Sequence, residues 1–552
     1  MKLIINEPLE NAPPSLAFAT IAMGAFRGLV VDVLWMRAER LKEQGQFFDA
    51  RQLAEWITTL QPRFAAVWEF QAWNMAYNIS VAIPATQPEE RWRWIKNGYE
   101  LLRDQGIPLN PRSILLYLEL ARIFQHKIGG ISDDVHKYYK LQLALAMEPL
   151  LGPADNEMFA ALAKAPSDWK QIANDPNVTP LITALKAADK TFDVDEEFVS
   201  NYLSLRQNPD RYKPEAFDVI DYFRGTNALS KFDIFAKAYH LRNTWKLDPA
   251  LMQELNQLYG PVDWNDPNGH LPLDWRHADT HAIYWAIKGL RIAGRGEYSA
   301  DETNTDRIVL HSLQNLFRNG KMFIYEVPAQ ATAESSSQLP LKPMKGIFLR
   351  PDLRMFEPYN KAVMATIEKY KELEGGGYSS MQIGHRNMLK NAILSFYQAG
   401  HTRQAQKMYD QLRQLYPMDE FKVPLVIFAR SRLREELSSI GLNDAKEIIQ
   451  MLLQEGYFRY AMRDDDEAFG REKMAKEIYD FYQSTYKDQD RVNLPDLKLL
   501  RYFALIDFLN DQQYPLSLRL ALRGRIKIER PDLSKQLEQQ EQIMLKEANQ
   551  PR

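Results

Sequence analysis

One spacing of glycine, alanine and proline occurs twice in the chain, and it limits the possible folds more than any other feature. Gly45 is followed by Ala50 and Pro62, and residues 400, 405 and 417 repeat these types at the same intervals. In each copy, a helix of large apolar residues is expected to end at the glycine, and a second helix to end before the proline. The spacing predicts paired helices that each bury one face against a neighbouring pair.

The same arrangement of large, small and aromatic residues recurs in four stretches. The matching positions are Leu34, Ala38, Leu41, Trp68, Ala72, Met75, Tyr117, Leu120, Ala121, Phe124, Leu389, Ala392 and Phe396. This spacing resembles that of tetratricopeptide-repeat proteins, over residues 31–150 and 384–417. The N-terminal part is also similar to uncharacterised bacterial envelope proteins of this type, in which a membrane segment precedes the repeats. An extra segment, residues 83–110, makes the array irregular.

The sequence predicts a mainly all-α fold, an irregular α-solenoid of such helix pairs with a small inserted β-hairpin. Residues 322–327 and 346–350 have the composition of two strands, joined by a Ser-, Gln- and Pro-rich loop. We expect N-terminal repeats (1–150), a middle helical domain that contains tryptophan (151–320), the hairpin with its flexible loop (321–355) and C-terminal repeats (356–552). All eleven tryptophans lie at or before Trp285, which favours different roles for the two halves.

Charge and cysteine content exclude several classes of function. The chain has 69 Lys and Arg against 72 Asp and Glu, a net charge of -3, so no global basic field attracts nucleic acid. It has no cysteine, which removes disulfides, thiolate metal sites and cysteine nucleophiles. The apolar run over residues 16–36 contains Arg27 and Asp32, so we expect a buried packing helix there and not a membrane span.

The resemblance also implies a binding surface. In tetratricopeptide-repeat proteins the first helix of each pair lines an inner groove, and the corresponding positions here are Trp35, Glu39, Glu69, Trp73, Tyr77, Arg122, His126, Lys390 and Tyr397. Trp and Tyr offer a large contact area at a small cost in side-chain entropy, which suits contacts to peptides or glycans. The alternative for each aromatic residue is that it only fills space between helices.

A stretch rich in histidine and aspartate is the candidate for a metal site. Its possible ligands are His270, His277, His281, Asp263, Asp274 and Asp279. On a helix, the spacing between His277 and His281 would place both rings on one face, as a metal-dependent hydrolase needs. Ala278 stands where the H-E-x-x-H motif has its glutamate. The alternative is that two Pro-x-Asp-Trp segments, 261–264 and 272–275, cap and pack against the following helix.

The sequence favours a non-enzymatic scaffold that binds a segment of another protein in a helical-repeat groove. The G-x-S-x-G elbow, a phosphate-binding loop and an EF-hand loop are all missing, so we predict neither catalytic residues nor a cofactor. The alternatives are an envelope protein that binds a glycan or peptide through its tryptophan-rich half, and a metal-dependent hydrolase at residues 263–281. The resemblance favours the bacterial cell envelope over the cytoplasm, with any membrane association made through a partner or an anchor. The oligomeric state stays open.

Overall fold

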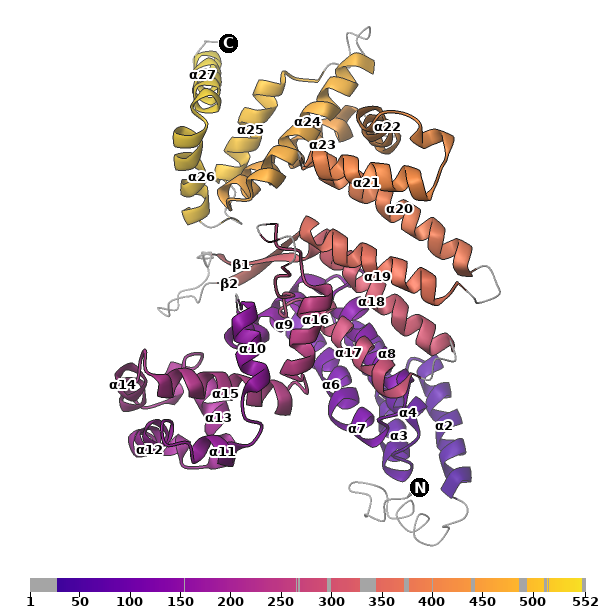
Figure 1. Ribbon diagram of the computed structural model, residues 1–552, viewed down its shortest axis with the longest axis vertical. Helices are drawn as coiled ribbons and strands as arrows, with labels where there is room; N and C mark the ends of the chain where they lie inside the picture. The colour runs from indigo at the N-terminus through magenta and orange to yellow at the C-terminus, as the bar shows by residue number, and fades with distance from the viewer. Residues whose placement is uncertain are drawn as a thin grey trace. The chain divides into compact units, whose positions relative to one another are not determined.

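The computed structural model describes most of the chain. The described ranges are 27–152, 154–264, 266, 269–294, 299–327, 344–371, 377–399, 401–437, 442–485, 494–510, 514 and 516–548. Helices account for 78% of the structure and strands for 2%, which confirms the mainly all-α fold class (Figure 1). The chain divides into two compact units, unit 1 (1–323 with 349–362) and unit 2 (324–348 with 363–552).

The first helix pair of unit 1 turns where the sequence indicates. α2 (Arg27–Glu43) and α3 (Phe47–Leu60) pack against each other, and Gly45 between them has a φ of 76°. Glycine adopts this conformation without the steric cost that a β-carbon would bring. α3 ends before Pro62, and Ala38 and Ala50 are fully buried in the core of the pair.

The outer side of α2 corrects one expectation from the sequence. Val31 and Leu34 are buried, but Leu29, Val33 and Met36 are 62%, 53% and 62% exposed. The described part of the apolar run is therefore a packing helix, as predicted, but it is buried on one face only. Residues 16–26 of that run lie outside the described residues. Among the helices that the structure describes, none is long and apolar enough to cross a membrane.

The second pair includes the segment that interrupts the repeat spacing in the sequence. Its first helix runs through α4 (Ala65–Trp73), the π-helical η2 (Asn74–Ile79) and α5 (Ser80–Ala82). Its second helix runs through α6 (Pro88–Leu101), the π-helical η3 (Leu102–Gly106) and α7 (Ile107–Leu109). The two helices approach so closely that a methyl group on Gly98 would lie 2.9 Å from the Ala72 carbonyl oxygen. Residues 83–110 are thus mainly the second helix of this pair.

The next helix packs against elements that are far away in sequence. α8 (Ile114–Arg122) continues into the π-helical η4 (Ile123–Ile128), and α9 (His136–Leu151) follows after a turn. α17 (Ala278–Ala293) and α18 (Ala300–Asn319) both contact α8. Gly289 of α17 lies against the Tyr117 side chain of α8, where a β-carbon would not fit. A glycine therefore permits the close crossing of α8 and α17.

Short helices between α9 and α17 include a group that builds a separate apolar core. The group is α11 (Trp169–Ala173), α12 (Thr179–Ala188), η5 (Lys190–Phe192), α13 (Asp195–Leu205), α14 (Pro214–Tyr222) and α15 (Asn227–Asn243). The same stretch of chain also forms α10 (Asn156–Lys164), η6 (Pro209–Arg211) and α16 (Pro249–Tyr259). Prolines start α14 and α16, where a missing N–H costs nothing. Phe192, Phe198 and Phe232 are fully buried in the core.

Two strands pair at the positions expected for the hairpin. β1 (Lys321–Val327) and β2 (Met344–Arg350) form a two-stranded sheet. The loop predicted between them lies outside the described residues. A 3-10 turn, η7 (Leu353–Met355), and α19 (Phe356–Lys369) follow β2.

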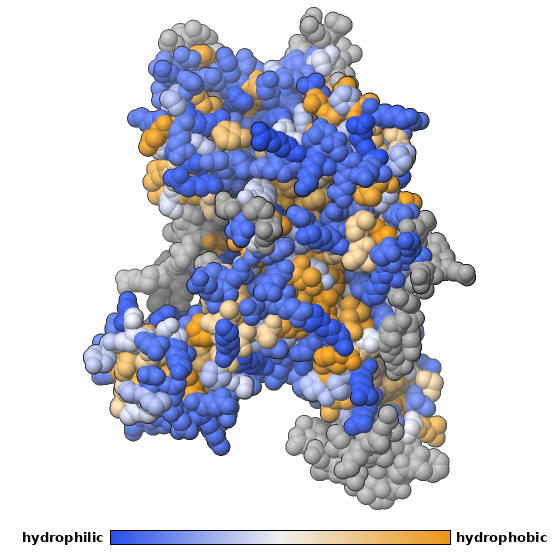
Figure 2. Space-filling model, in the orientation of Figure 1, coloured by the Kyte–Doolittle hydropathy of each residue, from blue (hydrophilic) through white to orange (hydrophobic). Residues whose placement is uncertain are grey.

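The remaining helices belong to unit 2. They are α20 (Gly377–Gln398), α21 (Thr402–Leu415), η8 (Asp419–Phe421), α22 (Leu425–Leu437), α23 (Leu442–Ala461), α24 (Asp465–Thr485), α25 (Leu497–Asn510), α26 (Leu516–Glu529) and α27 (Pro531–Ala548). α20 packs against α21, which buries Ala405 and Tyr409, while Gly400 lies outside the described residues. On the face drawn in Figure 2, hydrophilic residues predominate and hydrophobic residues form separate patches.

Candidate functional site

Several of the predicted groove residues come together on unit 1. Trp73 ends α4, Tyr77 lies in η2, and Arg122 and His126 lie at the end of α8 and in η4. The rings of Trp73 and Tyr77 stack with centroids 5.7 Å apart, and the centroids of Tyr77 and His126 are 5.8 Å apart. The Tyr77 hydroxyl donates to the Arg122 carbonyl oxygen at 3.4 Å. We call Trp73, Tyr77, Arg122, His126 and the neighbouring Glu69 the aromatic surface.

Trp35 lies beside the aromatic surface, and Lys42 contacts both Phe70, the neighbour of Trp35, and Trp73 of the aromatic surface. The Trp35 ring is 5.0 Å from the Phe70 ring, and both rings belong to the core of the first helices. The Lys42 ammonium lies 5.1 Å from the Phe70 centroid and 4.7 Å from the Trp73 centroid, close enough for cation–π attraction. Glu39 is exposed on α2.

The two predicted residues of the C-terminal copy lie on α20 in unit 2. Lys390 forms an ion pair with Glu420 at 2.8 Å, and its ammonium lies 5.1 Å from the centroid of the Phe421 ring. Tyr397 is 7% exposed, and the Lys473 ammonium lies 4.0 Å from its ring centroid. The nine predicted residues therefore form separate sets on the two units.

The aromatic surface coincides with π-helical turns that sequence reasoning missed. η2 carries Tyr77, η4 carries His126, and the two segments contact each other. π-helical turns are rare and occur frequently at functional sites, because one added residue per turn redirects the side chains. No residue pattern used above would have located them.

Burial sets the protonation of the charged groups at this surface. Glu119 is 1% exposed, and burial raises its pKa to about 8 although the Arg122 guanidinium, 3.1 Å away, opposes the shift. Burial also raises the pKa of Glu69, against the charges of Arg122 and Lys42. Burial, together with the nearby charges of Lys127 and Arg122, lowers the pKa of His126. The His126 imidazole is consequently neutral at pH 7 and can both donate and accept a hydrogen bond.

A buried ionic network, which we call the Asp133 network, lies under the surface. Asp133 has a side chain only 6% exposed and accepts hydrogen bonds from Lys127 at 2.7 Å and from Arg91 and the Tyr139 hydroxyl at 3.1 Å. The Val135 backbone N–H also donates to it at 3.1 Å. Lys127 belongs to η4, and its ammonium lies 5.5 Å from the Tyr77 ring centroid. The network thus ties η4 and the turn after it to the underside of the surface.

The histidines proposed as metal ligands have other roles. His277 lies before α17 and caps it, because its Nδ1 accepts from the Asp279 N–H at 3.2 Å. His281 lies inside the helix, fully buried, and its Nε2 donates to the Trp275 carbonyl oxygen at 2.9 Å. The expectation that both rings share one helical face is therefore wrong, because the helix begins after His277.

The other possible ligands are not gathered around these two. His270 donates through Nδ1 to the Gly260 carbonyl oxygen at 2.8 Å, and Asp274 binds the Arg276 guanidinium through both oxygens at 2.9 and 2.7 Å. Within the described ranges, no three His, Asp or Glu residues are placed to hold a metal ion. Trp275 is buried against α17, as the capping-and-packing alternative expects, whereas Trp264 is 47% exposed.

Asp279 forms a second buried polar site in unit 1. Its side chain is fully buried and accepts from Asn315 at 2.9 Å. Burial raises its pKa to about 7, with partial opposition from the Asn315 hydrogen bond and the Lys140 charge. Burial lowers the pKa of His277 and of His281 to about 4, so both imidazoles are neutral. These groups form a polar part of the core and are at most 2% exposed.

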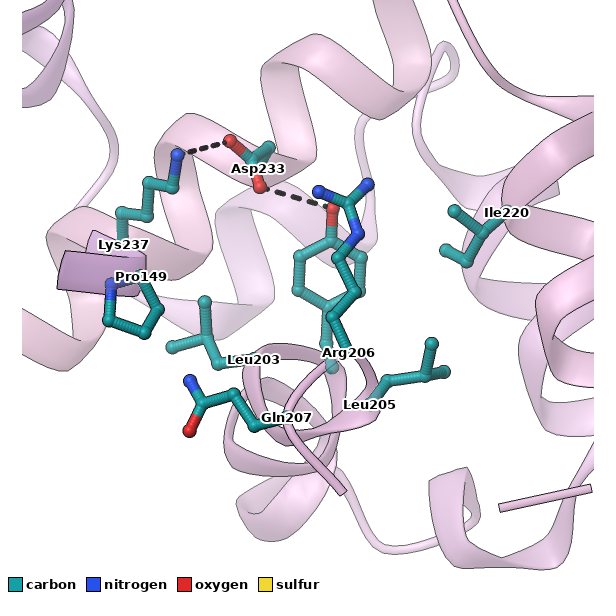
Figure 3. A pocket seen from close by; sticks show the side chains of 9 residues that line it. Pro149, Leu203, Leu205, Arg206, Gln207, Ile220, Asp233 and Lys237 are labelled. Carbon is teal, nitrogen blue, oxygen red and sulfur yellow. Dashed lines mark hydrogen bonds and ion pairs between the residues drawn. The ribbon is translucent and has the colours of Figure 1, made fainter. Parts of the chain in front are cut away.

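A small pocket lies where α9, α13, α14 and α15 meet (Figure 3). It has a volume of about 150 Å³ and is lined by Pro149, Tyr202, Leu203, Leu205, Arg206, Gln207, Ile220, Asp233 and Lys237. Asp233 accepts from the Tyr202 hydroxyl at 3.3 Å and pairs with Lys237 at 2.8 Å. Of the three charged groups that line the pocket, Asp233 and Lys237 are therefore already paired with each other. No sequence motif indicated this pocket.

Comparison with known proteins adds no assignment. No family model, curated protein or solved structure matches this chain.

Proposed function

We propose that this protein is a non-enzymatic scaffold that binds a segment of another protein on the aromatic surface. The observation that carries the proposal is the convergence of Trp73 and Tyr77 with Arg122 and His126, although 45 residues separate Tyr77 from Arg122. Partly buried rings that are held by neighbouring rings and cations supply contact area at little further entropic cost.

The polar groups of the surface suit the main chain of a bound segment. Neutral His126 donates and accepts, Arg122 donates, and Glu69 has a raised pKa and accepts. A peptide backbone presents one hydrogen-bond donor and one acceptor per residue. Together, His126, Arg122 and Glu69 offer both donors and acceptors, so they can bind both kinds of backbone group. We therefore propose a protein or peptide segment as the partner.

The architecture proposed with this function is an irregular solenoid of tetratricopeptide-like helix pairs. Its support is the contact between α2 and α3, between α4 and α6, and between α20 and α21. Stacked pairs of this kind leave extended surfaces that bind other chains.

Site-specific photocrosslinking in the source cells tests the proposal. A photoreactive amino acid at the exposed position His126 is expected to capture one defined protein, and Trp73→Ala should abolish the capture. The matched control is the same probe at Tyr222, which is 81% exposed and lies on α14. Identical captures from both positions, or a capture from His126 that survives Trp73→Ala, would contradict the proposal.

The second candidate is a glycan-binding protein, favoured by the stacked Trp73 and Tyr77 rings. A sugar that contacts the part of the Trp73 ring left exposed would change tryptophan emission. A saturable fluorescence change with oligosaccharides, lost in Trp73→Ala, would support this alternative over the protein segment.

A further inference from the structure

A groove in unit 2 is lined by the last three helices of the described chain. Helices α25, α26 and α27, labelled in Figure 1, contact one another. They enclose a volume of about 390 Å³. Its apolar lining includes Leu505, Leu509, Ile526 and Leu537. At the α26 side of the groove, Leu516 and Leu520 are 56% and 60% exposed. Contiguous exposed apolar surface marks an interaction site, whereas apolar residues exposed singly do not.

The two long sides of the groove carry opposite charges. Arg519, Arg523 and Lys527 are spaced four residues apart on α26, whereas Glu538 and Glu541 lie on α27. Residues four apart on a helix face the same side, so the cations form a row. Arg519 is held by its hydrogen bond to the Leu509 carbonyl oxygen at 2.7 Å. Within the described ranges, Arg523 and Lys527 are exposed and make no ion pair.

We propose that this groove binds one amphipathic α-helix of another protein, whose apolar stripe is flanked by Asp or Glu on the side that faces α26. The apolar stripe would cover Leu516 and Leu520, as in other complexes in which a helix lies in a groove. Carboxylates spaced one turn apart would meet Arg523 and Lys527. Glu538 and Glu541 repel acidic residues on the other flank, so the charges fix the orientation of the bound helix.

This surface is separate from the aromatic surface. It lies in unit 2 and shares no residue with the binding site proposed on unit 1. A scaffold with two surfaces can hold two partners, and either surface can be tested while the other is intact.

Two synthetic helical peptides test the proposal on the full chain. Both carry leucines at positions i, i+3, i+4 and i+7. One has glutamates along one flank, and the matched peptide has lysines there. Fluorescence anisotropy should show that the glutamate peptide binds at least about tenfold more tightly, since charge pairs determine partner choice across such an interface. Leu520→Glu should abolish binding.

Charge reversal on α26 tests whether its row of cations determines which of the two peptides binds more tightly. Arg523→Glu with Lys527→Glu should invert the preference, so that the lysine peptide binds more tightly. The matched control is Lys535→Glu, an exposed α27 residue outside the groove lining, which should leave both affinities unchanged. Circular dichroism would verify that each variant is folded.

Other outcomes overturn the proposal. Absence of binding by the glutamate peptide, equal binding of both peptides, or an unchanged preference after charge reversal would each do so. Self-association that Leu520→Glu abolishes would assign the groove to a second copy of the chain. Stronger binding to phosphatidylserine vesicles than to the glutamate peptide, lost on charge reversal, would assign it to a lipid surface.

Discussion

Asp133 and Asp279 both have buried side chains in unit 1, yet their pKa values are shifted in opposite directions. Burial by itself would raise the pKa of Asp133, but hydrogen bonds from Lys127 and the Val135 N–H and the Lys127 charge lower it below its usual range. Burial raises the pKa of Asp279 to about 7, because its close partner Asn315 is neutral and the Lys140 charge only partly opposes the shift. The Lys127 ammonium at hydrogen-bonding distance outweighs the effect of burial at Asp133, whereas Asp279, the more deeply buried of the two, accepts from a neutral amide.

The difference also separates two roles. The Asp133 network joins η4 to the turn that follows it, beneath Tyr77 and His126. Asp279 lies at the start of α17, in the core. The first site supports the proposed binding surface, and the second makes the stability of unit 1 depend on pH.

The largest expected effect is that of Asp133→Asn. The change leaves Lys127 and Arg91 buried without their counter-charge, and removing one partner of a buried pair costs about 3–5 kcal/mol. The measurement is urea unfolding followed by tryptophan fluorescence, which reports on unit 1 because all eleven tryptophans lie at or before Trp285. Asp134→Asn, at an exposed neighbour, is the control and should change stability by less than about 0.5 kcal/mol. Equal effects of the two changes would contradict the account of the network.

Asp279→Asn should alter the pH dependence of unfolding. The folded pKa of about 7 exceeds the unfolded value of about 3.9, so the folded state binds the proton more tightly. The Asp279 contribution to stability is therefore present at low pH and is lost as the pH rises from about 4 to about 7. His277 and His281, with lowered pKa values, act in the opposite direction and remain in the variant.

The difference in stability between Asp279→Asn and the unmodified protein reports on the Asp279 carboxyl alone, because both proteins keep the two histidines. The stability of Asp279→Asn relative to the unmodified protein should increase by about 2–4 kcal/mol between pH 4 and pH 8. Urea unfolding at a series of pH values, again followed by tryptophan fluorescence, provides the measurement. Two parallel stability curves would show that Asp279 ionises normally.

Gly129→Ala probes the place where the two aspartate sites approach each other. A β-carbon there would lie 3.1 Å from Asp279 Oδ2 and 2.7 Å from the Gln125 carbonyl oxygen. Such crowding typically costs about 1–3 kcal/mol. The control is Gly28→Ala on α2, where nothing lies within 4 Å and alanine favours the helix. Equal stability of both variants would mean that the turn has room for a side chain.

Tyr77→Phe should have the smallest effect. It removes one long hydrogen bond, 3.4 Å to the Arg122 carbonyl oxygen, and keeps the ring between Trp73 and His126. A net loss of at most about 1 kcal/mol is expected in the same unfolding experiment. A loss as large as that of Asp133→Asn would mean that the hydroxyl, and not the ionic network, holds the surface together.

Local features of the fold could be predicted from the sequence, and long-range ones could not. The turn at Gly45, the end of α3 before Pro62 and the two strands follow from residue types within one short window. The contact between α8 and α17 depends on Gly289 meeting Tyr117, which are 172 positions apart in sequence, and no periodicity reports such a pair.

The candidate site shows the same limit. Repeat spacing selected Tyr77, Arg122 and His126, which do lie together, but it also selected Lys390 and Tyr397, which lie on the other unit. The Asp133 network could not be found because its members belong to no shared pattern, and the π-helical turns depend on packing. The metal-site hypothesis requires a helix that includes His277, whereas α17 starts one residue later.

The central claim is that the Asp133 network holds the aromatic surface in one shape. Hydrogen exchange over residues 123–139 tests this claim most directly. Mass spectrometry should compare Asp133→Asn and Asp279→Asn with the unmodified protein at pH 7. The account predicts a loss of protection in Asp133→Asn that is larger in residues 123–139 than in the reference helix α15, and little change there in Asp279→Asn. Unchanged protection of residues 123–139 in Asp133→Asn would contradict it.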